Sequence, residues 1–271
     1  MRSWVGDHPL GFAVIGVLLA IATTTVLDAV GFGINVLLLP LVFFGCWYLQ
    51  RLTRIEIGLV LGAWQPYVLA VAYPVLVLTL IGVIARATGA ANMPAVNWTA
   101  ALLNLAGMVV VTAVFALVTE EGIFRGWLWA ALFRAGFRRN AVLVWTSVAF
   151  GLWHLSTALL PTPFHPALVQ VPVYIASAIA IGLVWAQLRL VSGSIAVTSV
   201  SHGLWNGLVY VLFGYGTTAG VFEIHNTLVF GPEIGLLGLG ANVVAAALLW
   251  LAVRRSKPAQ RPAAIAIPAT P

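Results

Sequence analysis

Charged residues are scarce in this sequence, and cysteine is almost absent. Only 7% of the 271 residues are charged, 13 Lys or Arg against 7 Asp or Glu, and 62% are hydrophobic. Because a soluble domain usually carries about 25% charged residues, this composition excludes a soluble enzyme and a disordered chain. Cys46 is the one cysteine, so an internal disulfide cannot form and a disulfide-stabilised secreted scaffold is excluded as well.

Long hydrophobic runs fill most of the chain. A helix that crosses a membrane needs about 20 mostly apolar residues. The sequence predicts an all-α fold, a polytopic membrane helix bundle with about eight transmembrane helices, and no internal repeat is evident. The first span lacks a convincing cleavage site, so we expect it to be retained, and 52–64 is expected to lie at the interface. The expected spans are roughly 10–27, 31–49, 66–85, 101–122, 141–160, 170–188, 193–213 and 234–253.

The few basic residues are distributed unevenly between the two ends of these spans. Eight spans place both termini on one side, together with eleven Arg or Lys residues. On the other side the one expected basic residue is Arg86, and the acidic residues there are Asp28, Glu223 and Glu233. Positive charge marks the cytoplasmic side, so we expect a multi-pass protein of the cell membrane with both termini cytoplasmic. The charge of +6 is then topological and attracts membrane lipid, not nucleic acid. The eleven are Arg2, Arg51, Arg54, Arg134, Arg138, Arg139, Arg189, Arg254, Arg255, Lys257 and Arg261.

Three predicted helices carry polar side chains at membrane depth. An ionisable residue costs about 2.5–3.5 kcal/mol at the centre of a membrane helix, so those that occur usually have partners or a function. At 1.5 Å per residue, all these groups lie about 15–20 Å from the cytoplasmic ends of their helices. We therefore expect them to meet in one buried cavity. They are Glu120, Glu121 and Arg125 on a helix that continues unbroken to Arg134, then His154, and finally His202 with Asn206.

This set of side chains suits hydrolysis of a peptide bond, which needs an activated water and a stabilised oxyanion. Glu121 and Arg125 are four residues apart and can pair on one helix face, so we expect Glu121 to stay ionised. Glu120 has no dedicated cation and is the better general base. Because the depths are measured from the arginine-rich side, substrate and water are expected to enter from the cytoplasmic face or laterally from the lipid.

Three short motifs in these helices resemble those of a known family. Residues 120–126 (EEGIFRG) resemble the EExxxR motif, 150–154 (FGLWH) the FxxxH motif, and 202–206 (HGLWN) the HxxxN motif. In this order they resemble the CPBP family, which contains CAAX prenyl proteases of the Ras-converting type and bacteriocin-processing or self-immunity proteins, once called Abi. The resemblance covers roughly residues 100–213.

The resemblance implies an intramembrane endopeptidase that acts on a peptide or membrane-protein substrate. It implies that Glu120 activates water and His154 assists it. His202 and Asn206 would stabilise the oxyanion, while Glu121 and Arg125 support the site. The expected organisation is N-terminal spans with an interfacial segment in 1–99, a catalytic core in 100–213, a loop and last span in 214–255, and a disordered tail in 256–271.

Several alternatives to this interpretation stay open at the level of the sequence. Two His and one Glu, here Glu120, His154 and His202, can hold a catalytic zinc with water as the fourth ligand, although an HExxH motif is absent. We favour chemistry without a metal. The same residues could relay protons in an ion-coupled transporter, although the sequence shows neither broken helices nor repeated halves, or they could persist in a non-catalytic adaptor or immunity protein. His8, His165 and His225 are expected to be solvated.

Overall fold

The computed structural model describes residues 2–31 and 35–255, so the predicted tail at 256–271 lies outside the described residues. Helices account for nearly all of the secondary structure, and the strands are two residues long. The elements are α1 (Arg2–Asp7), α2 (Pro9–Ala29), α3 (Asn35–Gln50), α4 (Arg54–Ile57), α5 (Gln65–Ala87), β1 (Ala91–Asn92), α6 (Trp98–Val118), η1 (Glu121–Leu128), α7 (Trp129–Arg134), α8 (Arg139–Trp153), α9 (Leu155–Leu159), η2 (Leu168–Gln170), α10 (Val171–Ser192), α11 (Ile195–Leu208), η3 (Val209–Phe213), β2 (Gly214–Tyr215), β3 (Thr218–Ala219), β4 (Glu223–Ile224), α12 (Thr227–Phe230) and α13 (Leu236–Arg255).

The long helices confirm the predicted polytopic membrane bundle. Within the described residues, seven helical segments are long and apolar enough to cross a membrane. The remaining predicted span, 31–49, corresponds to α3, which has 16 residues and contains Pro40. The seven are Pro9–Ala29, Gln65–Ala87, Trp98–Arg134, Arg139–Leu159, Leu168–Ser192, Ile195–Phe213 and Leu236–Arg254.

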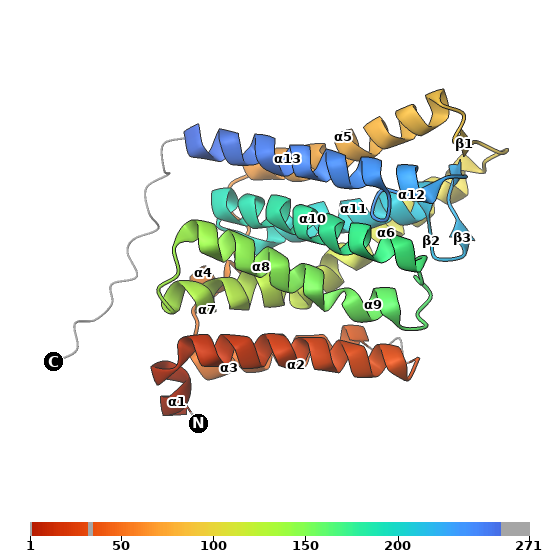
Figure 1. The fold of residues 1–271 in the computed structure, drawn as a ribbon. Coiled ribbons are helices and arrows are strands. Elements are labelled where there is room, and N and C mark those ends of the chain that lie inside the picture. The colour runs from red at the N-terminus through yellow and green to blue at the C-terminus, as the bar shows by residue number, and fades with distance from the viewer. Residues whose placement is uncertain (1, 32–34, 256–271) are drawn as a thin grey trace.

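The helices lie roughly side by side, and their ends form two distinct ends of the bundle (Figure 1). One end holds α1, α4 and the last turns of α7 and α13, and with them Arg51, Arg54, Arg134 and Arg254; we call it the arginine-rich end. The other end holds α9, α12 and the short strands, which pair as β1 with β4 and β2 with β3, both antiparallel. Arg86 lies near this end, in the last turn of α5.

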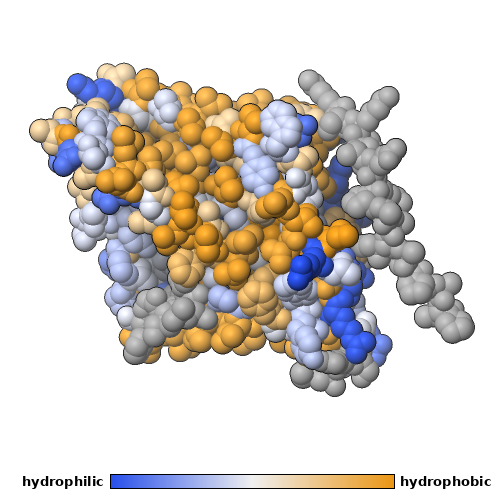
Figure 2. All heavy atoms as spheres, turned by 180° about the vertical axis from the view of Figure 1, so that it is seen from behind, coloured by the Kyte–Doolittle hydropathy of each residue, from blue (hydrophilic) through white to orange (hydrophobic). Residues whose placement is uncertain are grey.

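The outer surface of the bundle is apolar, as a lipid solvent requires. Figure 2 shows hydrophobic residues over most of one face, with the hydrophilic ones gathered toward its ends. Helix α6 illustrates this pattern, since Leu103 is 69% exposed and Val110 is 62% exposed. Side chains that would be unfavourable in contact with water are favourable in contact with acyl chains.

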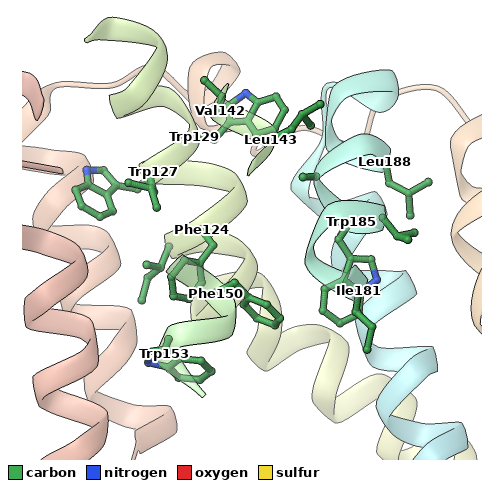
Figure 3. Packing of buried hydrophobic residues seen from close by; sticks show 14 of the residues in the cluster. Phe124, Trp127, Trp129, Val142, Leu143, Phe150, Trp153, Ile181, Trp185 and Leu188 are labelled. Carbon is green, nitrogen blue, oxygen red and sulfur yellow. The ribbon is translucent and has the colours of Figure 1, made fainter. Parts of the chain in front are cut away.

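Aromatic side chains form the centre of the bundle, where α8, η1 and α10 meet (Figure 3). Phe124 packs edge-on against Phe150 with ring centroids 5.5 Å apart, and Trp153 lies against both rings. Trp127 and Trp185 are almost fully buried in the same core. These rings surround the polar residues of the predicted motifs, so the motif residues are held by a closely packed shell.

Two glycines allow α11 to approach α6 closely. A Cβ atom at Gly203 would lie 2.5 Å from the carbonyl oxygen of Val109, and one at Gly207 would lie 2.5 Å from a methyl group of Val109. Small residues four apart on a membrane helix permit this kind of backbone contact. Because His202 and Asn206 each precede one of these glycines, the close contact also fixes the position of both polar side chains.

Two helices that the sequence predicts to be continuous are broken beside the motif residues. Helix α6 ends at Val118, Thr119 has φ −114° and ψ −94°, and the chain continues as a π-helix, η1. Helix α8 ends at Trp153, and α9 starts after His154. The helical segment does reach Arg134, as the sequence predicts, but its hydrogen bonding changes after Thr119, which hydropathy cannot register. The breaks put Glu120 and His154 at irregular positions, where π-type insertions often accompany function.

Candidate active site

A cavity of about 380 Å³ lies among α8, α10, α11 and the break between α6 and η1. Glu120, His154, His202 and Asn206 all line it, which places four of the predicted site residues around one space. Aromatic rings make up much of the remaining wall, among them Trp153, Tyr174, Trp185, Trp205, Tyr210 and Tyr215. This size is within the range of about 300–1,000 Å³ that is typical of ligand sites.

Both imidazoles face the same oxygen of Glu120. The Nε2 atom of His202 lies 3.6 Å from Glu120 Oε2, and the Nε2 atom of His154 lies 4.0 Å from it. The Glu120 side chain is 21% exposed and that of His154 is 15% exposed, so the carboxylate and the imidazole are open to the cavity. One carboxylate oxygen and two ring nitrogens thus surround a space that a water molecule can reach.

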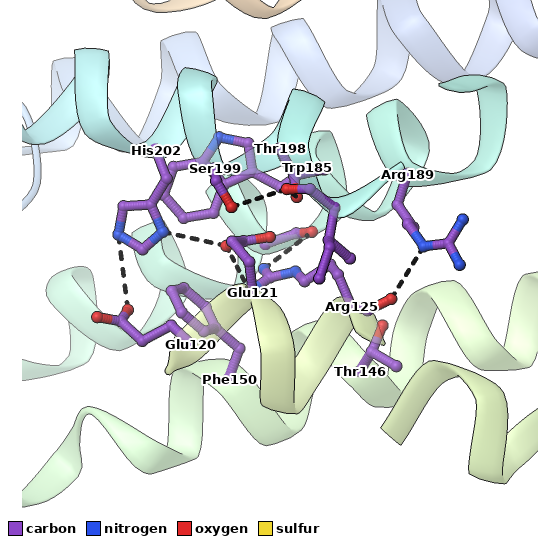
Figure 4. A network of polar contacts seen from close by, with 12 residues as sticks. Glu120, Glu121, Arg125, Thr146, Phe150, Trp185, Arg189, Thr198, Ser199 and His202 are labelled. Atoms are coloured by element: carbon purple, nitrogen blue, oxygen red, sulfur yellow. Dashed lines mark hydrogen bonds and ion pairs between the residues drawn. The ribbon is translucent and has the colours of Figure 1, made fainter. Parts of the chain in front are cut away.

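The opposite nitrogen of each imidazole is held by a fixed acceptor. His154 Nδ1 lies 2.8 Å from the carbonyl oxygen of Phe150, one turn earlier in the chain. His202 Nδ1 lies 3.0 Å from Glu121 Oε1 (Figure 4). A carbonyl and a carboxylate oxygen only accept hydrogen bonds, so both Nδ1 atoms donate, and the Nε2 atom of each ring is the one that faces Glu120 and the cavity.

The Glu121–Arg125 pair lies behind the cavity and is fully buried. Arg125 Nη1 is 3.3 Å from Glu121 Oε1, and both side chains have no exposed surface. Arg125 Nη2 also donates to the carbonyl oxygen of Gly182 at 3.3 Å, and its guanidinium lies 4.1 Å above the ring of Phe150. The pairing predicted from the four-residue spacing is present, and it continues through Glu121 to His202.

Two aromatic partners of the histidines were not assigned to the site from the sequence. Trp185 on α10 stacks on His202 with ring centroids 4.1 Å apart and an interplanar angle of 19°. Phe150 meets the ring of His154 edge-on at 4.5 Å. The sequence signal for Phe150 is its place in the FxxxH motif. Together they fix the orientation of both imidazoles.

Glu233, which also lines the cavity, was assigned only to the arginine-poor side from the sequence. Trp205 Nε1 donates to Glu233 Oε1 at 2.9 Å. Burial raises the pKa of Glu233, and this effect outweighs the hydrogen bond from Trp205, which lowers it. Burial and the charge of Glu233 likewise raise the pKa of Tyr215 to about 12. Both groups lie outside the spans, near the end of the bundle that carries the strands.

The remaining histidines and the cysteine lie apart from this cavity. His8, His165 and His225 are exposed, as the sequence predicts. Asn92 forms a 2.8 Å hydrogen bond with His225 beyond the span ends. Cys46 is buried in the hydrophobic core. None of these four residues lines the cavity.

The cavity is bordered differently toward the two ends of the bundle. Toward the arginine-rich end it is closed by a layer in which Phe124, Arg125, Trp127 and Leu188 have no exposed surface. Arg189 braces this layer, donating to the carbonyl oxygens of Arg125 and Glu56 at 3.0 Å each. This packing disfavours the expected route from the arginine-rich side and does not bear on the expected lateral entry from the lipid.

Glu120, His154 and His202 are the three residues that could ligate a zinc ion according to the sequence. In residues 2–31 and 35–255, no group of three or more His, Cys, Asp or Glu side chains has a geometry that could hold a metal ion. The three side chains face one another directly across 3.6 and 4.0 Å.

The fold and the cavity together define a class of protein. It is a multi-pass helical membrane protein in which a carboxylate and two imidazoles line a cavity inside the helix bundle. Residues 102–208 match the family described as type II CAAX prenyl endopeptidase Rce1-like. This match confirms the predicted resemblance to the CPBP family over the part of the chain that carries the three motifs. It indicates a CAAX-type intramembrane protease, and hence a hydrolase. No curated protein and no solved structure matches the chain.

Proposed function

We propose that the protein is an intramembrane endopeptidase in which Glu120 and the two histidines activate water against a peptide bond. The observation that carries this proposal is the convergence of both Nε2 atoms on Glu120 Oε2 inside a cavity. A general base must lie within hydrogen-bonding reach of the proton that it removes, directly or through one water. A water among these three atoms meets that condition.

The reaction begins when Glu120 takes a proton from this water. The water oxygen bonds to the carbonyl carbon of the substrate, and the carbonyl π electrons move onto its oxygen to form a tetrahedral oxyanion. When the oxyanion collapses, the carbon–nitrogen bond breaks. The proton held by Glu120 passes to the leaving nitrogen, with His154 Nε2 close enough to relay it. The products are a carboxylate and an amine.

His202 and Asn206 are the proposed donors to the oxyanion. In its neutral form His202 cannot donate from Nε2, because its proton is on Nδ1. Donation to the oxyanion therefore requires a second proton on the ring, with Glu121 Oε1, 3.0 Å away, as the acceptor of the Nδ1–H bond. An imidazolium Nε2–H and the amide N–H of Asn206 on the same cavity wall can then stabilise the negative charge. Glu121 and Arg125 are positioning residues in this scheme.

The ion-coupled transporter is the weaker alternative. The breaks at Thr119 and His154 are features that a transporter also uses, and the sequence had given no sign of them. Repeated halves are not evident in the sequence, however, and the family match is to an endopeptidase. Hydrolysis of a peptide therefore explains the polar cavity more fully than proton transfer across the membrane does.

The substrate is proposed only as a class, a peptide or membrane-protein segment that reaches a cavity within the membrane. To test this, the purified protein is reconstituted in proteoliposomes and supplied with two sets of quenched fluorescent peptides. One set has a prenylated CAAX sequence and the other carries no lipid, and hydrolysis of each set is measured. Cleavage that resists stringent chelation supports the scheme. Loss of cleavage on chelation, restored by zinc, would overturn its metal-independent part, and a failure to cleave either set together with proton flux would favour the transporter.

A further inference from the structure

The cavity communicates with only one end of the bundle among the described residues. Asp28, at the end of α2, lines it, as do Thr157 of α9 and Thr162 in the loop that follows α9. Tyr215 of β2 and Glu233 line it as well. All of these elements lie at the end that carries the strands, opposite the arginine-rich end (Figure 1).

The opposite route is blocked by side chains that cannot move independently. Arg125 and Glu121 are fully buried and paired with each other, and Figure 4 shows Arg189 bound to the backbone of Arg125 behind them. Trp127, also without exposed surface, donates its ring N–H to Gln50 at 2.7 Å. Opening this side would require breaking a buried ion pair, which typically costs several kcal/mol.

The two ends also differ in charge. The cavity lining contains Asp28, Glu120 and Glu233 but neither Lys nor Arg among the described residues. The closed end carries Arg51, Arg54, Arg134, Arg139 and Arg254. Since positively charged loops stay in the cytoplasm during membrane insertion, the closed end is the one expected to face the cytoplasm.

We infer that the cavity opens toward the extracytoplasmic side, so that its substrates are exported or membrane-anchored peptides presented from that side, not lipidated chain ends lying on the cytoplasmic leaflet. This inference takes the catalytic role from the proposed function and adds the side from which substrate arrives. A cavity of about 380 Å³ admits a short extended segment and excludes a folded domain.

Site-directed labelling tests the inference without relying on catalysis. Cys46→Ala removes the one native cysteine. Single cysteines are then introduced by Thr162→Cys at the cavity mouth and by Asn140→Cys, an exposed position at the arginine-rich end. Right-side-out and inverted membrane vesicles are treated with a bulky membrane-impermeant maleimide. Glu223→Cys, exposed on β4, provides a second position at the mouth end if Thr162→Cys does not insert.

We expect the Thr162→Cys protein to react in right-side-out vesicles and the Asn140→Cys protein only in inverted ones. The labelled Thr162→Cys protein should then cleave externally added quenched peptide at least tenfold more slowly, whereas labelled Asn140→Cys should be unaffected. The reversed labelling pattern, or unchanged cleavage after labelling at Thr162, would overturn the inference. Because labelling does not need activity, the same single-cysteine proteins carrying Glu120→Gln should be labelled in the same pattern. Failure of the proposed function is detected separately, as undiminished peptide cleavage by the Glu120→Gln protein.

Discussion

His202 stands between two carboxylates, with Nδ1 donating to Glu121 Oε1 at 3.0 Å and Nε2 facing Glu120 Oε2 at 3.6 Å. The two neighbouring glutamates, Glu120 and Glu121, therefore have different roles. Glu121 is fully buried against Arg125 and fixes the proton on one side of the ring. Glu120 is open to the cavity and is available to the reaction. This division of roles follows from the break at Thr119, which separates the regular α6 from the π-helix.

Replacement of Glu121 should lower both stability and activity. Glu121→Gln leaves Arg125 as a buried charge without its partner, and breaking such a pair typically costs about 3–5 kcal/mol. It also removes the carboxylate that holds His202. We expect a lower melting temperature in detergent and slower peptide cleavage, measured on the same preparation.

A double variant separates these two effects of Glu121. In Glu121→Gln/Arg125→Met the unpaired charge is gone, and replacing a buried pair by apolar groups is often neutral or stabilising. The melting temperature should recover toward that of the wild type while cleavage stays slow, because His202 Nδ1 then faces a neutral amide oxygen in place of the carboxylate. Recovery of both quantities together would show that Glu121 has only a structural role.

The glycine contact between α6 and α11 should tolerate no side chain. Gly203→Ala places a methyl group 2.5 Å from the Val109 carbonyl oxygen, and overpacking of this kind typically costs about 1–3 kcal/mol. Gly107→Ala on α6 is the matched control, since a Cβ there meets nothing within 4 Å. We expect a lower melting temperature for Gly203→Ala alone; equal melting temperatures would contradict the close approach.

The ion pair of Glu56 with Arg134, 2.7 Å between Nη2 and Oε1, should make stability depend on pH. Burial raises the pKa of Glu56, but hydrogen bonds from the Thr53 backbone N–H and from Arg134 outweigh it and hold the pKa below its usual value. A lowered pKa contributes stability that is present above the unfolded value of about 4.3 and is lost as pH falls through the folded value.

The Glu56→Gln variant should therefore melt below the wild type at pH 7. Lowering the pH through the lowered pKa of folded Glu56 should bring the two melting curves together, because the wild-type carboxylate then becomes protonated as well. Glu223→Gln, at an exposed position, serves as the control. A gap between wild type and Glu56→Gln that stays constant from pH 7 to pH 3 would argue against the ion pair.

The sequence predicts the membrane bundle and the shared depth of the polar residues well, because hydropathy and helical rise are local properties. It could not predict the breaks at Thr119 and His154, which depend on backbone hydrogen bonds within the packed bundle. The stacking of Trp185 on His202 joins α10 to α11 and is invisible without the tertiary arrangement. The dense layer around Arg125 could not be predicted either, since depth measured along a helix does not show how side chains from other helices pack against it.

Turnover of the Glu120→Gln protein is the most direct measurement of the central claim, that Glu120 activates the water. Wild type, Glu120→Gln and the control Glu223→Gln should be reconstituted at equal density and supplied with the same quenched peptide. General-base catalysis typically contributes about 10²–10⁴-fold, so Glu120→Gln should lose at least about 100-fold in cleavage rate, with membrane insertion and melting temperature retained and Glu223→Gln unaffected. Cleavage by Glu120→Gln within a few-fold of wild type would contradict the account.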